Sequence, residues 1–253
     1  EEAEAFAPHV VLTRLRTVLR VPQSPNACRR RGCHDRRPSS RGVGSSRRVA
    51  GFSSGGRTCY TGAVAKLYFR YGTMDSAKTL NLLAVAHNYR KQGKRCALMK
   101  PRLDVRFGEA AIRSRSGLEA EADFLVGPED DLPMEELSKL DCVLVDEAQF
   151  LSEKNIESLR ELTIVHGVPV ICYGLRTDFQ ARLFVGSKRL LELADAIEEV
   201  KVTCYFCGKK AIFNLRMVDG HGVFEGPQVV LGADEKYVPV CAAHYREQVL
   251  AAR

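Results

Sequence analysis

Residues 72–79, which read GTMDSAKT, have the types and spacing needed to bind a phosphate group. They match the phosphate-loop pattern G-x-x-x-x-G-K-[ST] except at the second glycine, where Ala77 stands. In such a loop the backbone N–H groups converge on phosphate oxygens at a helix N-terminus, where the helix dipole favours an anion. We expect Lys78 to reach the β- and γ-phosphates of a nucleotide and the Thr79 hydroxyl to ligate Mg²⁺.

Two adjacent acids follow an apolar run at residues 142–150, which read CVLVDEAQF. Such a run is typical of a buried parallel strand, and ligands of parallel sheets bind at the carboxyl ends of the strands. Asp146 is therefore placed to hold a magnesium ion, and Glu147 is placed to act on a nucleophile. Acids at strand ends are common, and Asp146 could instead cap the next helix. The lysine-bearing loop upstream favours the functional interpretation.

A third group of residues has the spacing of metal ligands. Cys204-x-x-Cys207 and Cys241-x-x-His244 form two ligand pairs, which predict a closed tetrahedral Zn²⁺ site. Four protein ligands leave no position for water, so we expect a structural role, and we expect Gly208 to allow a tight turn around the metal. The rival function is a nucleic-acid-binding zinc ribbon, but no pattern of basic and aromatic residues accompanies the ligands.

The elements that must position these groups can be read from the same sequence. A β-rich run at residues 66–71 precedes the phosphate loop, and a helical pattern follows it. Ser152 is expected to start a helix that ends near Gly167, and residues 168–174 supply another buried strand. Strands that alternate with helices predict an α/β fold with a mostly parallel sheet.

The net charge of +7 is distributed unevenly along the 253 residues. Residues 1–63 contain 12 arginines and four acids, so the remaining residues are close to neutral, and the charge does not point to a nucleic-acid partner. No run approaches the roughly 18 apolar residues that a membrane-spanning helix needs. Three of the nine cysteines, Cys96, Cys142 and Cys172, stand in apolar runs, which indicates buried thiols and a reducing compartment.

The composition of residues 1–63 predicts a disordered leader, because Arg, Ser and Gly dominate it. One amphipathic stretch at residues 10–21 fits an organelle transit peptide, although Glu1, Glu2 and Glu4 argue against one. In the alternative interpretation these residues are translated upstream sequence and not native, with a natural start near Val64, because no Met precedes Met74.

Five longer segments carry a resemblance to a known family. KLYFRYGTMDSAKT, VLVDEAQF, CYGLRTDF, CYFCGKKA and VVLGADEKYVPVC follow one another between residues 65 and 245. In this order they resemble the cytosolic, zinc-containing thymidine kinases. The resemblance implies ATP-dependent phosphorylation of the 5′-hydroxyl of thymidine, and of deoxyuridine, to the monophosphate in pyrimidine salvage. It also implies three segments: a leader at 1–63, a P-loop ATP-binding α/β domain at 64–200, and a zinc-binding domain at 201–253 whose lasso loop closes over the nucleoside.

The resemblance assigns roles residue by residue. Glu147 is implied as the general base, with Lys78 and Arg106 at the transferring phosphoryl group. The implied ATP-binding residues are Gly72, Thr73, Met74, Asp75, Ser76, Ala77, Lys78, Thr79, Asp146, Glu147, Ala148 and Gln149. The implied nucleoside-binding residues are Met74, Phe150, Leu175, Phe179, Phe184, Gln228, Val229, Val230, Leu231, Gly232 and Tyr237.

The resemblance further implies a homotetramer that dTTP inhibits by feedback, in the cytoplasm unless the leader directs the chain to an organelle. ATP, Mg²⁺ and structural Zn²⁺ are the implied cofactors, and neither a membrane nor a specific nucleic acid is an expected partner. Ala77 leaves one alternative function open. If this position needs φ > 0, a Cβ costs on the order of 1 kcal/mol, and the chain could be a nucleotide-binding protein with impaired turnover.

Overall fold

The computed structural model describes residues 64–104, 108–228 and 236–251. The expected leader at residues 1–63 lies outside these residues. So do Arg106 and four of the implied nucleoside-binding residues, Val229, Val230, Leu231 and Gly232.

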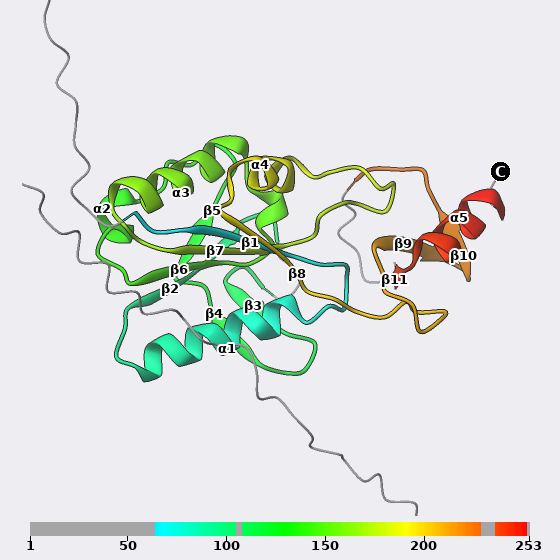
Figure 1. The fold of residues 1–253 in the computed structure, drawn as a ribbon, viewed down its shortest axis with the longest axis horizontal. Helices are drawn as coiled ribbons and strands as arrows, with labels where there is room; N and C mark the ends of the chain where they lie inside the picture. The colour runs from blue at the N-terminus through cyan, green and yellow to red at the C-terminus, as the bar shows by residue number, and fades with distance from the viewer. Residues whose placement is uncertain (1–63, 105–107, 229–235, 252–253) are drawn as a thin grey trace, which may run out of the picture. The chain divides into compact units, whose positions relative to one another are not determined.

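Six parallel strands form the central sheet, in the order β5-β2-β6-β7-β1-β8 (Figure 1). The expected α/β fold with a parallel sheet is confirmed. The strand after which the two acids stand, β6, consists of four fully buried residues, as a continuous apolar run predicts. The bounds of the strands are β1 Leu67–Tyr71, β2 Cys96–Pro101, β5 Phe124–Val126, β6 Cys142–Val145, β7 Val170–Gly174 and β8 Ala196–Glu199.

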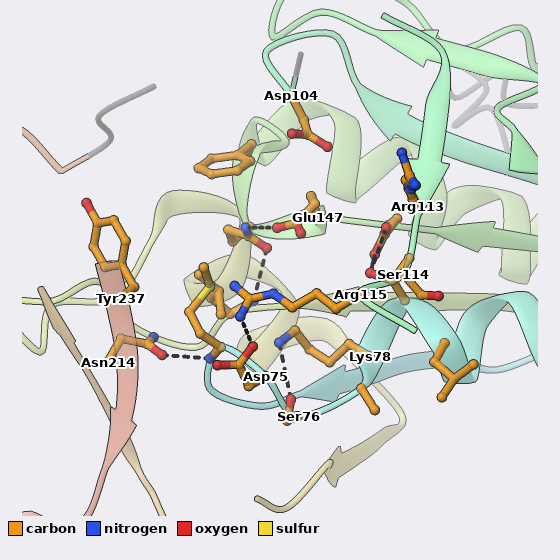
Figure 2. Close-up of a pocket in the computed structure, with 18 of the residues that line it drawn as sticks. Asp75, Ser76, Lys78, Asp104, Arg113, Ser114, Arg115, Glu147, Asn214 and Tyr237 are labelled. Atoms are coloured by element: carbon orange, nitrogen blue, oxygen red, sulfur yellow. Dashed lines mark hydrogen bonds and ion pairs between the residues drawn. The ribbon is translucent and has the colours of Figure 1, made fainter. Parts of the chain in front are cut away.

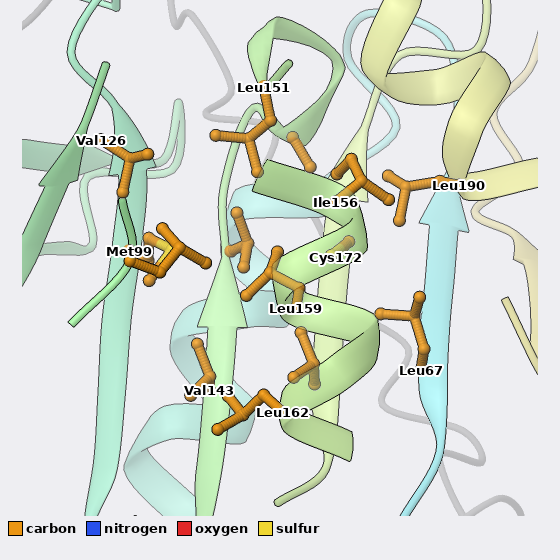
Figure 3. Close-up of a cluster of buried hydrophobic side chains, with 14 of the residues drawn as sticks. Leu67, Met99, Val126, Val143, Leu151, Ile156, Leu159, Leu162, Cys172 and Leu190 are labelled. Atoms are coloured by element: carbon orange, nitrogen blue, oxygen red, sulfur yellow. The ribbon is translucent and has the colours of Figure 1, made fainter. Parts of the chain in front are cut away.

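Helices cover both faces of this sheet (Figure 1). Helix α1 (Lys78–Lys91) packs on one face with Cys142 and Leu144 of β6. Helices α3 (Glu153–Val165) and α4 (Val185–Leu193) pack on the other face with Val143 and Val145, in the apolar cluster of Figure 3. Successive side chains of a strand point to opposite faces, which is why every residue of β6 is buried.

The helix expected from Ser152 is present as α3. Ser152 is its N-cap and forms a reciprocal capping box with Asn155, which stabilises the start of the helix. Two short helices complete this part of the chain, α2 (Met134–Leu137) and the single 3₁₀ turn η1 (Ala148–Phe150).

The strand order places three functional segments side by side. Strands β6, β7 and β1 are neighbours and run in the same direction, so the chain leaves all three at the same edge of the sheet. The phosphate loop follows β1, the two acids follow β6, and residues 175–184 follow β7. This edge is where ligands of doubly wound sheets bind.

Two smaller sheets lie outside the parallel sheet. A β-hairpin consists of β3 (Ala111–Arg113) and β4 (Glu119–Glu121). The second is an antiparallel sheet in the order β10-β9-β11, followed by a helix. Its elements are β9 Phe213–Val218, β10 His221–Val223, β11 Lys236–Val240 and α5 Ala242–Ala251.

The helices in the described part of the chain are too short or too polar to cross a membrane.

Candidate functional site

The phosphate loop takes a strained backbone conformation at two non-glycine residues. Asp75 (φ 61°) and Ala77 (φ 58°, ψ 29°) are both left-handed, and Ala77 immediately precedes α1. Inside the loop, the Lys78 ammonium donates to the Thr73 carbonyl (2.6 Å), and the Ser76 hydroxyl donates to the same oxygen (2.9 Å). These bonds fold the loop around its own lysine, at the N-terminus of a helix.

Gly72 is the position of the loop where a side chain cannot fit. A Cβ there would lie 2.3 Å from Ser76 Oγ and 2.5 Å from the Val200 carbonyl oxygen. The first glycine of the pattern is therefore needed for close packing. At the second glycine position of the pattern stands Ala77, and its left-handed backbone conformation is one that glycine favours.

The loop and the first of the two acids meet. The Thr79 hydroxyl donates to Asp146, with an oxygen–oxygen distance of 3.1 Å. Burial, and then the neighbouring charge of Glu147, raise the pKa of Asp146 to about 7, although the hydrogen bond from Thr79 lowers it. A hydroxyl and a carboxylate at this distance are the donor types that Mg²⁺ takes in phosphate-loop sites, so these residues fit a magnesium ion.

Glu147 is held from the side by a buried amide. Gln149 Nε2 donates to Glu147 Oε2 (2.5 Å), and the Leu175 N–H donates to Gln149 Oε1 (3.0 Å). Gly174 allows this approach, because a Cβ there would lie 2.7 Å from Gln149 Oε1. The backbone of Glu147 is left-handed (φ 48°), which turns its side chain away from the strand direction. The carboxylate thus has a fixed orientation in the cavity shown in Figure 2.

One cavity of about 490 Å³ joins the sequence-predicted residues. Its lining includes the phosphate-loop residues Met74, Asp75, Ser76, Ala77, Lys78 and Thr79, the acids Asp146 and Glu147, and Gln149. It also includes every implied nucleoside-binding residue that the structure describes, namely Met74, Phe150, Leu175, Phe179, Phe184, Gln228 and Tyr237. Gly72, Thr73 and Ala148 are buried and do not line it.

Sequence reasoning missed several lining residues. Asp104 is 6% exposed and is held by an ion pair with the buried Lys100 (3.2 Å). The tip of the β3–β4 hairpin contributes Arg113, Ser114, Arg115 and Ser116. Figure 2 shows Arg115 crossing the cavity to pair with Asp75 of the phosphate loop.

Asp178 and Asn214 were missed as well. For the β3–β4 hairpin a signal was present in the sequence: residues 113–117 (RSRSG) combine cations and hydroxyls in a turn, which is typical of anion binding. An asparagine inside a strand is disfavoured, and that was the one available signal for Asn214.

The four predicted metal ligands converge near α5. Their ligand atoms all lie within 4.8 Å of one another. Cys207 and Cys241 Sγ are 3.9 Å apart, and His244 Nδ1 lies 3.4 Å from both Cys204 and Cys241 Sγ. Tetrahedral zinc with Zn–S bonds of about 2.3 Å separates its sulfurs by about 3.8 Å. The cluster therefore fits a structural zinc ion.

Gly208 does not have the role expected of it. It has no left-handed φ, and a Cβ there would meet no atom within 4 Å. The turn after the first ligand pair does not require a glycine.

A lysine-bearing loop between a parallel strand and a helix, with a hydroxyl–carboxylate pair beside it, defines the class of P-loop phosphotransferases. Comparison with known proteins identifies the family. Residues 65–245 match the family described as thymidine kinase. The chain therefore belongs to the thymidine kinase family, and the resemblance seen in the motifs is confirmed.

Three relatives, all named thymidine kinase, illustrate the match. The enzyme of Lactococcus lactis subsp. lactis (strain IL1403) is 45% identical over 187 residues. Those of Streptococcus pyogenes serotype M3 (strain ATCC BAA-595 / MGAS315) and Streptococcus agalactiae serotype Ia are 46% identical over 186 and 187 residues. Each alignment covers 72% of this chain and 97% of the relative. These names denote phosphotransferases and give no support to a protein with impaired turnover.

The alignment with a solved structure of Pif1 helicases at forked double-stranded DNA covers 53% of this chain and 39% of the helicase chain. Its TM-score of 0.33 and 20% identity are too low to carry a conclusion.

Proposed function

We propose that this chain transfers the γ-phosphoryl group of ATP to the 5′-hydroxyl of thymidine, and of deoxyuridine, in pyrimidine salvage. One observation supports this most directly: the phosphate-loop residues and a group of apolar and aromatic side chains line the same cavity. A nucleoside in the apolar part and a triphosphate on the loop would meet beside Glu147. Membership of the thymidine kinase family points to the same reaction.

In the proposed reaction Glu147 is the general base. It accepts the proton of the 5′-hydroxyl while the 5′-oxygen bonds to the γ-phosphorus. The bond from that phosphorus to the β–γ bridging oxygen breaks, and ADP leaves. Gln149 supports this role, because its hydrogen bond to Oε2 orients the carboxylate. Lys78 supplies positive charge at the phosphates, and Arg106 remains a proposed phosphoryl contact outside the described residues.

Thr79 and Asp146 are the residues that would hold Mg²⁺. The ion would neutralise developing charge on the phosphates. It would also offset the burial and the repulsion that raise the pKa of Asp146.

The nucleoside pocket is proposed to close with the lasso segment, of which the structure describes one end. Gln228 Nε2 donates to Asp178 Oδ2 (2.8 Å), which ties that end to the loop after β7. Phe179 and Tyr237 face each other edge to face, with ring centroids 6.3 Å apart. A planar pyrimidine suits such an aromatic site.

The same proposal divides the chain into an ATP-binding domain at 64–200 and a zinc domain at 201–253. Feedback inhibition by dTTP, a homotetrameric assembly and a cytoplasmic location also belong to the proposal.

The deciding experiment compares the wild type with Glu147→Gln. We expect the wild type to form ADP in a thymidine-dependent manner and the variant to lose roughly 10²- to 10⁴-fold in kcat, while its affinity for ATP is retained. The matched control is Glu161→Gln, the same chemical change at an exposed position of α3. Full activity of Glu147→Gln would remove that residue from the base role. A wild type without thymidine-dependent turnover across a nucleoside panel would refute the proposed function.

A further inference from the structure

One buried amide joins three segments that are far apart in the sequence. Asn214, on β9 of the antiparallel sheet, is 3% exposed. Its Oδ1 accepts from the Met74 N–H of the phosphate loop (2.7 Å), as Figure 2 shows. Its Nδ2 donates to the Thr177 carbonyl (3.0 Å) in the loop that follows β7. Both polar atoms of this side chain are therefore bonded to backbone, at the wall of the cavity.

The tie to Met74 acts on the strained part of the loop. Met74 immediately precedes Asp75 and lies three residues before Ala77, and both of these are left-handed without being glycine. Such residues persist in this conformation only where their surroundings hold it. The bonds from Lys78 and Ser76 to the Thr73 carbonyl are internal to the loop. The bond from Asn214 anchors the loop to a separate sheet.

The position of Asn214 is itself well fixed. It lies opposite Pro239 in the β9–β11 pairing, and its neighbour Leu215 is fully buried in the small core that contains Cys204 and Cys241. The anchor of the phosphate loop is thus part of the sheet that packs against the metal cluster.

We propose that Asn214 is a positioning residue for ATP: it holds the Met74 N–H and thereby keeps the phosphate loop in the conformation that binds phosphate. The inference rests on the proposed function only in naming ATP as the ligand. Without Asn214, other loop conformations become populated, and the apparent affinity falls by the fraction of molecules that stays competent. A buried N–H that loses its acceptor corresponds to about tenfold in such an equilibrium.

The test uses the full-length, zinc-loaded protein with Asn214→Leu, which keeps the branched shape and the number of heavy atoms and removes both hydrogen bonds. We expect the dissociation constant for ATP to rise about tenfold, and the Met74 amide to exchange its hydrogen about tenfold faster. Amides of β9 and β11 keep their protection.

Two further variants separate positioning from folding. Asn155→Leu removes an equally buried amide that also bonds to backbone, at the start of α3, and we expect it to lower the Tm without weakening ATP binding. Asn214→Asp keeps an acceptor for Met74, and we expect it to restore the protection of the Met74 amide.

The proposal is overturned if Asn214→Leu leaves both the ATP affinity and the exchange rate of the Met74 amide unchanged. It is also overturned if the variant loses amide protection throughout β9, because the effect is then a loss of folding of that sheet and not of loop position. A failure of the proposed function gives a different result. The wild type would then show no thymidine-dependent turnover, while ATP affinity and amide exchange would still report on Asn214.

Discussion

The replacement of Ala77 by glycine tests how the phosphate loop tolerates its departure from the common pattern. Ala77 already takes the left-handed conformation that the loop needs, and it is exposed, so glycine removes strain without removing packing. A left-handed alanine costs about 1–2 kcal/mol, and the extra freedom of glycine in the unfolded chain returns about 0.4–1 kcal/mol of this. The net gain in the free energy of unfolding is therefore about 0.5–1 kcal/mol. For a chain of this size that corresponds to a rise in Tm of roughly 1–4 °C.

The matched control is Ala181→Gly, because Ala181 is also left-handed (φ 63°) and exposed but does not line the cavity. Both variants are expected to raise the Tm by the same amount in thermal unfolding. In a coupled assay of ADP formation, Ala77→Gly lowers the KM for ATP by at most about fivefold, the equivalent of the strain released. Its kcat stays within about twofold of the wild type, because Lys78, Thr79 and the two acids are unchanged.

Two results would refute this reasoning. A kcat for Ala77→Gly that exceeds the wild type by about tenfold would mean that the alanine impairs turnover. A fall in Tm for Ala77→Gly, with a rise for Ala181→Gly, would mean that the alanine Cβ makes a stabilising contact in the phosphate loop.

Two other perturbations test the framework around the site. Partial burial disfavours the charge of Asp195, but hydrogen bonds from Arg160 and from the Leu67 N–H outweigh it and lower the pKa of this carboxyl. Its stabilising contribution is thus complete above its ordinary pKa and disappears as the pH falls through the lowered one. Asp195→Asn should lower the free energy of unfolding by at most about 1 kcal/mol at pH 7 and leave it unchanged at low pH, as measured by urea unfolding at each pH. A difference between wild type and variant that is the same at both pH values would contradict a lowered pKa of Asp195. Removal of zinc by a chelator should abolish amide protection in β9 and β11 and leave β1 and β7 protected. The reason is that the core of the antiparallel sheet consists of five buried residues, and two of them, Cys204 and Cys241, are metal ligands. Protection of β9 in protein shown to be metal-free by elemental analysis would count against a structural metal.

The local parts of the site could be predicted from sequence because each is written in one short segment. The phosphate loop needs a strand, a turn and a helix in succession, and residues 66–91 encode all three. Asp146 and Glu147 were found because a continuous apolar run ends directly before them. The ligand pairs at Cys204 and Cys241 were found by their spacing. In each case the chemistry and the backbone geometry come from neighbouring residues.

The parts that could not be predicted depend on contacts between distant segments. The hairpin tip with Arg115 reaches the phosphate loop only through the packing of β3 and β4 beside α1. Asn214 is 140 residues from Met74, and no local pattern distinguishes an asparagine that holds a loop from one at a sheet edge. Gly208 shows the opposite error, since a glycine next to a ligand pair suggested a turn that the backbone forms without it.

These two kinds of information explain together how Ala77 can occupy a glycine position. The sequence shows only the departure, which by itself favours a weakened loop. The structure shows the contacts that oppose the strain: two donors on the Thr73 carbonyl from within the loop, and the acceptor of Asn214 on the Met74 N–H from outside it. The left-handed Asp75 and Ala77 cost at most about 1–2 kcal/mol each, and each net hydrogen bond contributes about 0.5–1.5 kcal/mol, so three such bonds are comparable in size to the strain. Tolerance of the alanine should therefore depend on Asn214. If it does, the effects of Ala77→Gly and Asn214→Leu on ATP affinity will not be additive, because glycine will recover part of what the leucine variant loses.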